Sequence, residues 1–203
     1  MRRRLLFLAA PLALVGCGSL LPAQKYIPRT IWPLQPQPPT AKAAPPGAPV
    51  VLIRAINPAP GLEQRGLQSL AGNGNLVIDY YNLWAVPPAE AITQGLINWA
   101  QASGDFAAVI TPGSRLTPNL IVEGELSELL VDLTKNQAQA RMTLLVIKPA
   151  LALASYTQPL IQAKLTATAP VQGNSPEAQA NAQSDAVANL LAQAITLLGH
   201  YNR

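Results

Sequence analysis

The stretch LIVEGELSELLVDLTKNQAQARMTLLVI, residues 120–147, carries the clearest structural pattern in the chain. Apolar and polar side chains alternate with a period of two on both sides of a polar turn at residues 134–137. This alternation is typical of an antiparallel hairpin with one buried face. The expected buried side chains are Leu120, Val122, Leu126 and Leu130 in the first strand, and Ala138, Ala140, Met142, Leu144 and Val146 in the second.

Shorter strand patterns flank this hairpin. Residues 61–70 are ambiguous between a short helix and an irregular segment, and Gly72-Asn73-Gly74-Asn75 predicts a tight turn. β-branched and aromatic residues favour extended backbone. On that basis further strands are expected at residues 50–56, 76–84, 106–110 and 160–168.

A first helix is expected from about residue 88 to residue 102. Pro87 and Pro88 suit the start of a helix, where the missing N–H costs nothing, and Ser103-Gly104 suits its end. The apolar stripe of this helix consists of Ile92, Leu96 and Trp99.

A second helix is expected to close the chain. Ser175 is a candidate N-cap, Pro176 and Glu177 favour the first turn, and Gly199 is placed to end the helix. The order of the elements predicts an α+β fold, a two-layer sandwich in which two main helices cover one face of a mixed, mostly antiparallel sheet. The stripe expected to pack on the sheet consists of Val187, Leu190, Leu191, Ala194 and Leu198.

The N-terminus has the form of a lipoprotein export signal. Three arginines at positions 2–4 precede an apolar run at residues 5–15, which is too short to cross a bilayer because a spanning helix needs about 20 residues. Leu14-Val15-Gly16-Cys17 has the form of a lipobox. We therefore expect residues 1–16 to be a signal peptide and Cys17 to become the new N-terminus.

Cys17 is the expected site of lipid attachment. It is the one cysteine of the chain, so no internal disulfide can form and a free thiol would be a liability in an oxidising compartment. A diacylglycerol and an acyl chain such as palmitate would anchor it stably. The alternative is an ordinary cleaved signal with a coincidental cysteine. Gly18, rather than Asp, follows the cysteine, which resembles sorting to the outer membrane, at the periplasmic face of the envelope.

The segment between the anchor and the expected domain is rich in proline. Residues 22–49 contain too many prolines for a helix or a central strand, so residues 17–49 are interpreted as a semi-rigid linker before a domain at residues 50–203. The linker either lets the domain reach a partner or only keeps it clear of the bilayer. Three large side chains within it, Tyr26, Ile31 and Trp32, indicate that part of it packs on something.

Charge and residue types argue against several functions. The net charge of +4 includes the three arginines of the signal, so the mature chain is nearly neutral and carries no basic patch for nucleic acid. His200, the one histidine, has no activating partner, and no set of ligands for zinc is present. We therefore expect no enzymatic activity, no cofactor and no metal.

One acidic cluster could suggest paired catalytic carboxylates. It consists of Glu123, Glu125, Glu128 and Asp132. Glu123 and Glu125 share a strand face, which is also the polar face, where Arg141 of the returning strand could pair with one of them. The solvated-face interpretation is favoured over catalysis.

The aromatic segment at residues 80–87 is the candidate partner surface. Tyr81, Trp84 and Pro87 are the residues we assign to it, because exposed aromatic side chains are enriched at protein interfaces. Packing of Trp84 in the core is the competing explanation.

The motif Tyr81-Asn82-Leu83-Trp84-Ala85-Val86-Pro87, together with the lipobox, the hairpin and the terminal helix, resembles the ABC-type transport auxiliary lipoprotein family, the PqiC-like group. Val86 stands where members commonly carry an acidic residue. The resemblance implies a role beside an MCE-type substrate-binding subunit, in a system that carries lipids or other hydrophobic compounds across the bacterial envelope. It also implies assembly as a homo-oligomer at the receiving membrane.

Two other functions remain open from the sequence. A stalked outer-membrane lipoprotein could activate a cell-wall synthase by reaching through the wall on the segment 22–49. A lipid hydrolase would require turnover by the purified domain, which the residue inventory does not support.

Overall fold

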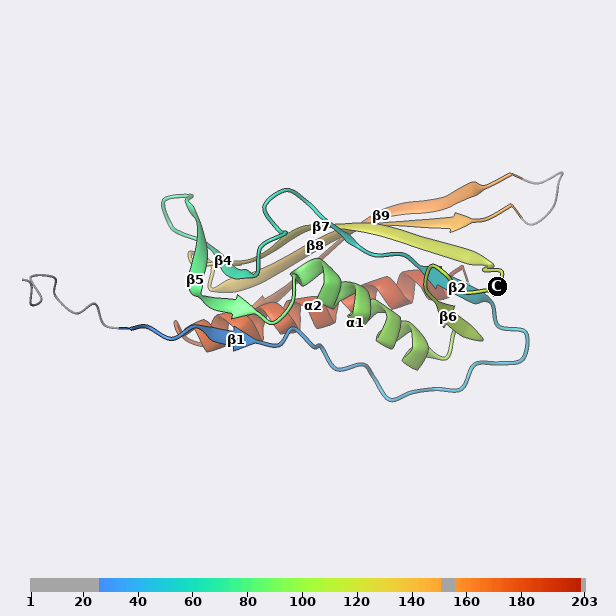
Figure 1. Cartoon of the computed structure of the whole chain (residues 1–203), viewed down its shortest axis with the longest axis horizontal. Coiled ribbons are helices and arrows are strands. Elements are labelled where there is room, and N and C mark those ends of the chain that lie inside the picture. The colour runs from blue at the N-terminus through green and yellow to red at the C-terminus, as the bar shows by residue number, and fades with distance from the viewer. Residues whose placement is uncertain (1–25, 151–155, 202–203) are drawn as a thin grey trace, which may run out of the picture.

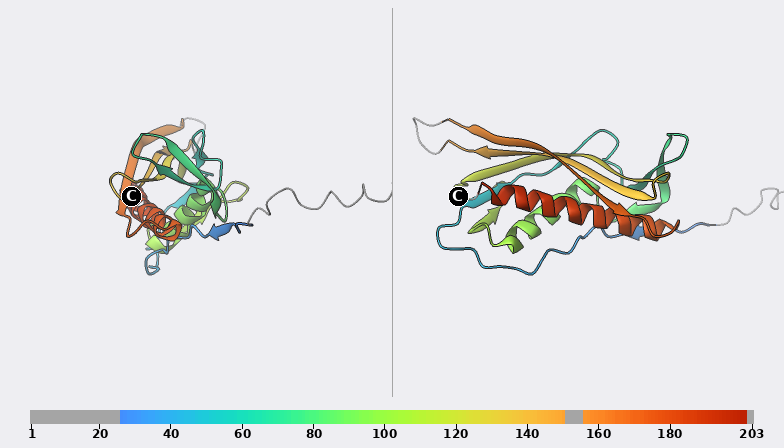
Figure 2. Two further views of the ribbon diagram at one scale, coloured as in Figure 1. Left: turned by 90° about the vertical axis from the view of Figure 1, so that its left-hand side faces the viewer. Right: turned by 180° about the vertical axis from the view of Figure 1, so that it is seen from behind.

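The computed structural model describes residues 26–150 and 156–201, so the expected signal peptide and Cys17 lie outside the described residues. One mixed sheet of nine strands forms a layer over two helices (Figure 1). The same two layers are seen from behind and end-on in Figure 2. The expected α+β sandwich is confirmed.

The long strands of the sheet are antiparallel. Strand β7 (Leu120–Asp132) pairs with β8 (Gln137–Lys148), which pairs with β9 (Gln158–Pro170). The predicted hairpin is therefore present. Its second strand buries the expected face, since Ala138, Ala140, Met142, Leu144 and Val146 are all 1% exposed or less.

A β-bulge changes which residues of β7 are buried. The register with β8 shifts between Leu126 and Glu128, so Ser127 is an extra residue. A one-residue shift turns the following side chains to the opposite face. As a result Leu129 and Val131 are buried, whereas Leu130, expected in the core, is half-buried.

The other edge of β7 is covered by three short strands that run parallel to it. These are β2 (Val50–Ile53), β3 (Asn57–Pro58) and β4 (Gly66–Leu70). The segment 66–70, ambiguous in the sequence, is a strand: β7 pairs with Ser69 and Leu70, and β5 (Leu76–Trp84) pairs with it from Gly66 to Leu70. Outside these strands lie β6 (Ala108–Ile110) beside β2, β5 (Leu76–Trp84) antiparallel to β4, and β1 (Thr30–Trp32) parallel to β5.

Both helices have the expected positions. Helix α1 (Pro88–Ser103) ends at Gly104, whose φ of 78° is readily adopted by glycine. In α2 (Pro176–Gly199), the N-cap Ser175 accepts a hydrogen bond at 3.1 Å from the backbone N–H of Ala178. Gly199 is the last helical residue, but the cap itself is His200 in a right-handed conformation. The predicted stripe of α2 is fully buried: Val187, Leu190, Leu191, Ala194 and Leu198.

The proline-rich segment packs on the domain instead of standing free of it. Residues 33–49, here called the strap, run from β1 past the helices to β2 (Figure 1). Leu34 is 3% exposed in the core. The indole Nε1 of Trp99 donates to the carbonyl of Pro36 at 3.2 Å, and the N–H of Lys42 donates to the carbonyl of Ala102 at 3.0 Å.

Within the described residues, the first strand of the domain therefore begins at Thr30, ahead of the expected boundary at Val50. Proline excludes this segment from a helix or a central strand, but it does not prevent apolar side chains from packing between other elements. The expectation that part of the linker packs is confirmed for Trp32, which contacts the core. Tyr26 and Ile31 remain exposed.

Candidate interaction surface at the β1–β5 end

The site begins with a large bulge in β5. Gly66 pairs with Leu83 and Gln68 pairs with Ile78, so the four residues 79–82 lie opposite one residue of β4. We call residues 79–82 the aromatic bulge. Such insertions bend a strand and redirect its side chains.

The carboxylate of Asp79 holds the bulge in shape. Its Oδ1 accepts hydrogen bonds from the backbone N–H groups of Tyr81 at 2.7 Å and Asn82 at 2.9 Å. Its Oδ2 accepts a third from the side-chain amide of Asn82 at 2.8 Å. Asp residues favour such local turns because their carboxylate can bond to the backbone two residues later. The two tyrosines are thereby presented on a fixed backbone.

Gly66 provides the space that the bulge needs. A Cβ atom at this position would lie 2.6 Å from both the carbonyl oxygen of Asp79 and Cγ2 of Ile78. A backbone carbonyl in a bulge fixed by hydrogen bonds cannot move away easily. Any side chain at residue 66 would therefore displace the bulge.

Arg29 and Trp32, at the N-terminal end of the described residues, contact this bulge. The Nε1 of Trp32 donates to Oδ1 of Asn82 at 3.3 Å. The guanidinium of Arg29 lies 4.2 Å from the ring centroid of Tyr80, a cation–π contact. The rings of Tyr80 and Tyr81 pack edge to face with centroids 5.2 Å apart. These contacts bring β1 and β5 into one surface.

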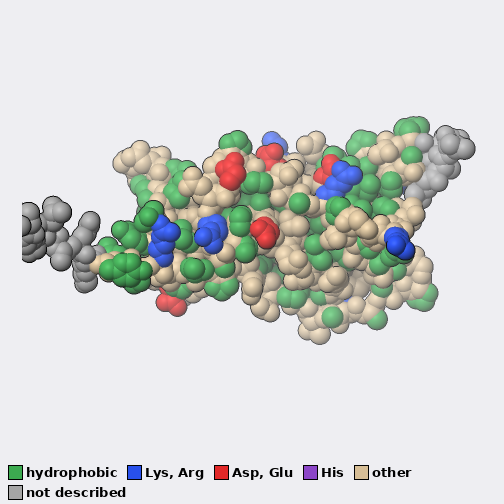
Figure 3. All heavy atoms as spheres, viewed as in Figure 1, with side chains coloured by type: hydrophobic (Ala, Val, Ile, Leu, Met, Phe, Trp, Pro, Cys, Tyr) green, Lys and Arg blue, Asp and Glu red, His purple; other side chains and the backbone are tan. Residues whose placement is uncertain are grey.

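This surface exposes large apolar side chains. We call it the N-terminal apolar surface and define it as Tyr26, Ile27, Ile31, Tyr80 and Tyr81. Tyr26 is 84% exposed, Tyr80 65% and Ile31 59%. In Figure 3 hydrophobic side chains gather at the end of the molecule next to the grey tail. Apolar groups concentrated at one place on a surface mark contact with another molecule or a membrane.

A pocket of about 600 Å³ adjoins this surface, and two arginines line it, Arg29 and Arg65. Arg65 donates to the carbonyl of Ala85 at 3.0 Å. Within the described residues, no carboxylate pairs with either arginine. The two acidic residues of the pocket are bonded to backbone instead, because Glu63 accepts from the N–H of Gly61 at 2.7 Å and Asp79 holds the bulge.

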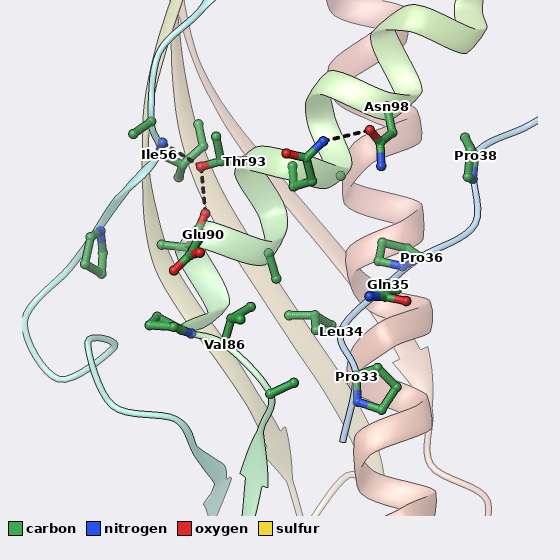
Figure 4. A pocket seen from close by; sticks show the side chains of 18 of the residues that line it. Pro33, Leu34, Gln35, Pro36, Pro38, Ile56, Val86, Glu90, Thr93 and Asn98 are labelled. Atoms are coloured by element: carbon green, nitrogen blue, oxygen red, sulfur yellow. Dashed lines mark hydrogen bonds between the residues drawn. The ribbon is translucent and has the colours of Figure 1, made fainter. Parts of the chain in front are cut away.

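A larger groove of about 860 Å³ lies between the strap, α1 and residues 55–58 (Figure 4). Thr93 links helix α1 to residue 56 within this groove. Its Oγ1 accepts a hydrogen bond from the N–H of Ile56 at 2.9 Å and donates one to the carbonyl of Ala89 at 2.7 Å. Glu90 is the one charged residue among those that line it. With prolines and aliphatic side chains along its walls, the groove suits the binding of an apolar group better than acid–base chemistry.

The three predicted interface residues have different environments. Trp84 is 1% exposed, so the packing explanation accounts for it. Tyr81 is 39% exposed in the bulge. Pro87 is half-buried and lines both the groove and the smaller pocket. The sequence did not reveal the roles of Asp79, Gly66 and Arg29, although the spacing of Asp79 and Asn82 is compatible with an Asx turn.

The acidic cluster of β7 is divided among separate ion pairs. Glu123 pairs with Arg54 at 2.7 Å and Glu128 pairs with Arg141 at 2.8 Å. Arg141 was expected opposite Glu123 or Glu125. The unbroken register from the β7–β8 turn to the bulge places it opposite Glu128 instead.

Asp132 lies at the end of β7 and is 2% exposed. The ammonium of Lys135 at 2.7 Å and the hydroxyl of Thr134 at 2.6 Å hold the pKa of the Asp132 carboxyl well below its usual range, against the opposing effect of burial. The group therefore has a local structural role at the β7–β8 turn.

The remaining sequence candidates can be placed as follows. His200 caps α2, and its N–H donates to the carbonyl of Leu197 at 3.2 Å. Over residues 26–150 and 156–201, no group of three or more His, Cys, Asp or Glu side chains could hold a metal ion. None of the helices in that same part of the chain combines the length and apolarity needed to cross a membrane.

Solved structures of two bacterial proteins have the same fold. A crystal structure of a protein from Xanthomonas campestris has a TM-score of 0.67 at 15% identity and covers 85% of this chain and 97% of its own. A hypothetical protein from Chlamydia trachomatis has a TM-score of 0.50 at 10% identity, covering 75% and 96%. At these identities the likeness establishes the fold alone.

Comparison with sequences gives one informative result. A search of curated proteins finds no match. The model of the family described as the ABC-type transport auxiliary lipoprotein component matches residues 32–195. The match begins at Trp32, so it includes the strap that fastens to α1 as well as both helices and most of the sheet. The chain belongs to the family of ABC-type transport auxiliary lipoprotein components.

Proposed function

We propose that the protein is the lipid-anchored auxiliary component of an ABC transport system that moves lipids or other hydrophobic compounds across the bacterial envelope. It acts by binding and scaffolding, with an MCE-type substrate-binding subunit as its partner. The family match over residues 32–195 carries this proposal. The division of the β7 carboxylates among separate ion pairs supports a binding role over hydrolysis.

The packed strap favours this role over activation of a cell-wall synthase. That alternative depended on a long spacer at residues 22–49, but the chain is already part of the sheet at Thr30. Between Cys17 and Thr30 an extended chain reaches at most about 45 Å. The domain is therefore held close to the membrane that carries its anchor, which we propose to be the outer membrane.

The partner contact is proposed at Tyr81 and Pro87, extended by Val86 at the mouth of the groove. Val86 is 37% exposed and, like Pro87, lines both the groove and the smaller pocket. Trp84 supports this surface from below as a core residue. Assembly of several copies at the membrane is part of the same proposal.

Photo-crosslinking in the native membrane tests the proposal. A photoreactive phenylalanine at Tyr81 or Val86 is expected to capture an MCE-domain protein, whereas the same group at Tyr156, which is 74% exposed and precedes β9, is expected not to. Failure of an acylated, membrane-bound chain to capture such a protein from either position would refute the partner. Capture of a cell-wall synthase would favour the alternative.

A further inference from the structure

We propose that the N-terminal apolar surface, apart from Tyr81, which is assigned to the partner contact, lies on the phospholipid bilayer that holds the chain's own anchor. Tyr26, Ile27, Ile31 and Tyr80 would sit at the depth of the headgroups, and Arg29 and Arg65 would bind lipid phosphates. The inference rests on the proposed acylation of Cys17 and adds an orientation of the domain relative to the membrane.

The length of chain before the structure places this surface near the bilayer. Tyr26 lies nine positions after Cys17. A fully extended chain of that length spans at most about 30 Å, which is comparable to the width of a small domain. The end of the molecule that carries β1 and the aromatic bulge is therefore the end nearest the anchor (Figures 1 and 3).

The residue types of this surface match a bilayer interface. Tyrosine is enriched at the headgroup level of membranes because its ring is apolar and its hydroxyl is polar. Tyr26 and Tyr80 are 84% and 65% exposed, and the isoleucines Ile27 and Ile31 are 52% and 59% exposed. Water solvates none of these apolar groups well, so a contact with lipid removes an unfavourable exposure.

Two of the four charged side chains that line the adjoining pocket, Arg29 and Arg65, suit a phospholipid phosphate; the other two, Glu63 and Asp79, are negatively charged. Within the described residues, Arg29 and Arg65 are not paired with a carboxylate. The neighbouring acids, Glu63 and Asp79, already accept hydrogen bonds from backbone N–H groups. The pocket between them thus offers two guanidinium groups to an external anion, and guanidinium binds phosphate in a bidentate manner.

The surface is also held rigidly, so that its orientation is determined. Asp79 fixes the bulge through three hydrogen bonds, and Trp32 ties β1 to Asn82. Arg29 stacks on Tyr80 at 4.2 Å. Because β1 and the aromatic bulge are fixed relative to each other, a bilayer that contacts both can do so in one orientation of the domain.

The opposite end of the molecule supplies a matched control. The β8–β9 end points away from β1 in both views of the long axis (Figures 1 and 2). Tyr156, two residues before β9, is 74% exposed, close to the value for Tyr80. The two tyrosines are thus similar in type and exposure but differ in their distance from the anchor.

Depth-dependent fluorescence quenching tests the orientation. Because Cys17 is the one cysteine and its sulfur would be in a thioether, Tyr80→Cys, Ile31→Cys and Tyr156→Cys each give one free thiol for a polarity-sensitive fluorophore. Each full-length acylated chain is reconstituted into vesicles of phosphatidylethanolamine and phosphatidylglycerol that contain nitroxide lipids. We expect at least threefold stronger quenching at residues 80 and 31 than at residue 156. Equal quenching, or stronger quenching at residue 156, would overturn the proposal.

A charge variant tests the phosphate contact in the same vesicles. Arg29→Gln combined with Arg65→Gln is expected to lower quenching at residue 80 at least twofold. The Arg→Lys pair, which keeps both positive charges but loses the bidentate geometry, is expected to lower it less. The alternative occupant is a second copy of the chain. In that case the lipid quenching would be lost, and energy transfer between labelled copies would rise with protein density. That result would overturn the proposal.

The two proposals fail in different ways. An unmodified sulfhydryl at Cys17, found by mass spectrometry, removes the anchor and with it this orientation. An acylated chain that floats with the vesicles but shows no preferential quenching at residues 80 and 31 overturns the orientation alone. Circular dichroism of each labelled variant verifies that the fold is intact.

Discussion

Trp32 donates a hydrogen bond from its indole Nε1 to the side-chain oxygen of Asn82, 3.3 Å away and 50 positions later in the chain. The bond joins the start of the folded part to the aromatic bulge of β5. Next to it, Trp32 is paired in register with Trp84 across the parallel β1–β5 ladder. The N-terminal segment is consequently a structural element of the domain, and its removal would expose the core.

Leu34→Ala tests the packing of the strap. Leu34 is 3% exposed, so truncation leaves a cavity and is expected to lower the free energy of unfolding by about 2–5 kcal/mol. Gln37→Ala, on the exposed part of the same segment, is the control and should stay within about 0.5 kcal/mol of the parent. Urea denaturation measures both, and equal effects would show that the strap does not contribute to the core.

Gly66→Ala tests the support of the aromatic bulge. The added Cβ would lie 2.6 Å from the carbonyl oxygen of Asp79, so we expect a loss of stability of about 1–3 kcal/mol and a displaced Tyr80. Gly72→Ala is the matched control, because its Cβ would meet Thr134 at an ordinary 3.5 Å. Thermal unfolding and labelling at residue 80 report the two effects. A Gly66 variant as stable as the Gly72 variant would argue against the close contact.

Leu129→Ala and Leu130→Ala test the β7 bulge. Leu129 is 2% exposed in the core, whereas Leu130 is half-buried. The first substitution is expected to cost about 2–5 kcal/mol and the second roughly half of that or less. The reverse order, measured by denaturant unfolding, would mean that β7 keeps an uninterrupted alternation.

Asp132→Asn tests the ion pair at the β7–β8 turn. Lys135 and Thr134 hold the pKa of the folded-state carboxyl below its unfolded value of about 3.9. A depressed pKa stabilises the fold above the unfolded pKa, and this contribution is lost as the pH falls through the folded pKa. The variant should therefore be less stable than the parent at pH 7, and the difference should shrink below about pH 4. A difference that is constant between pH 7 and pH 3 would contradict the shift.

The elements with strong periodicity could be predicted from the sequence. The hairpin of β7 and β8 and the helices α1 and α2 form where alternation, apolar stripes and end residues such as Ser175 and Gly104 agree. Local backbone preference and side-chain burial favour the same structure in these segments. By contrast, residues 66–70 become a strand because β5 pairs with them from Gly66 to Leu70 and β7 pairs with Ser69 and Leu70.

The candidate surface could be predicted only in part. The sequence identified residues 80–87 as an aromatic segment, but its side chains differ in exposure. Trp84 is buried in the core, whereas Tyr80 and Tyr81 are exposed. The cause is the bulge, which depends on Gly66 of the neighbouring strand and on hydrogen bonds from Asp79. No pattern of period two contains that information.

The sequence by itself determined the β7–β8 hairpin, both helices and the fold class, and it predicts lipid attachment at Cys17, because each depends on residues close together in the chain. The tertiary structure decided that residues 30–49 belong to the domain, that Arg141 pairs with Glu128, and that Arg29 stacks on Tyr80. These contacts join residues 13 or more positions apart. They follow from which strands become neighbours and where a bulge shifts the register, and local preferences do not encode either.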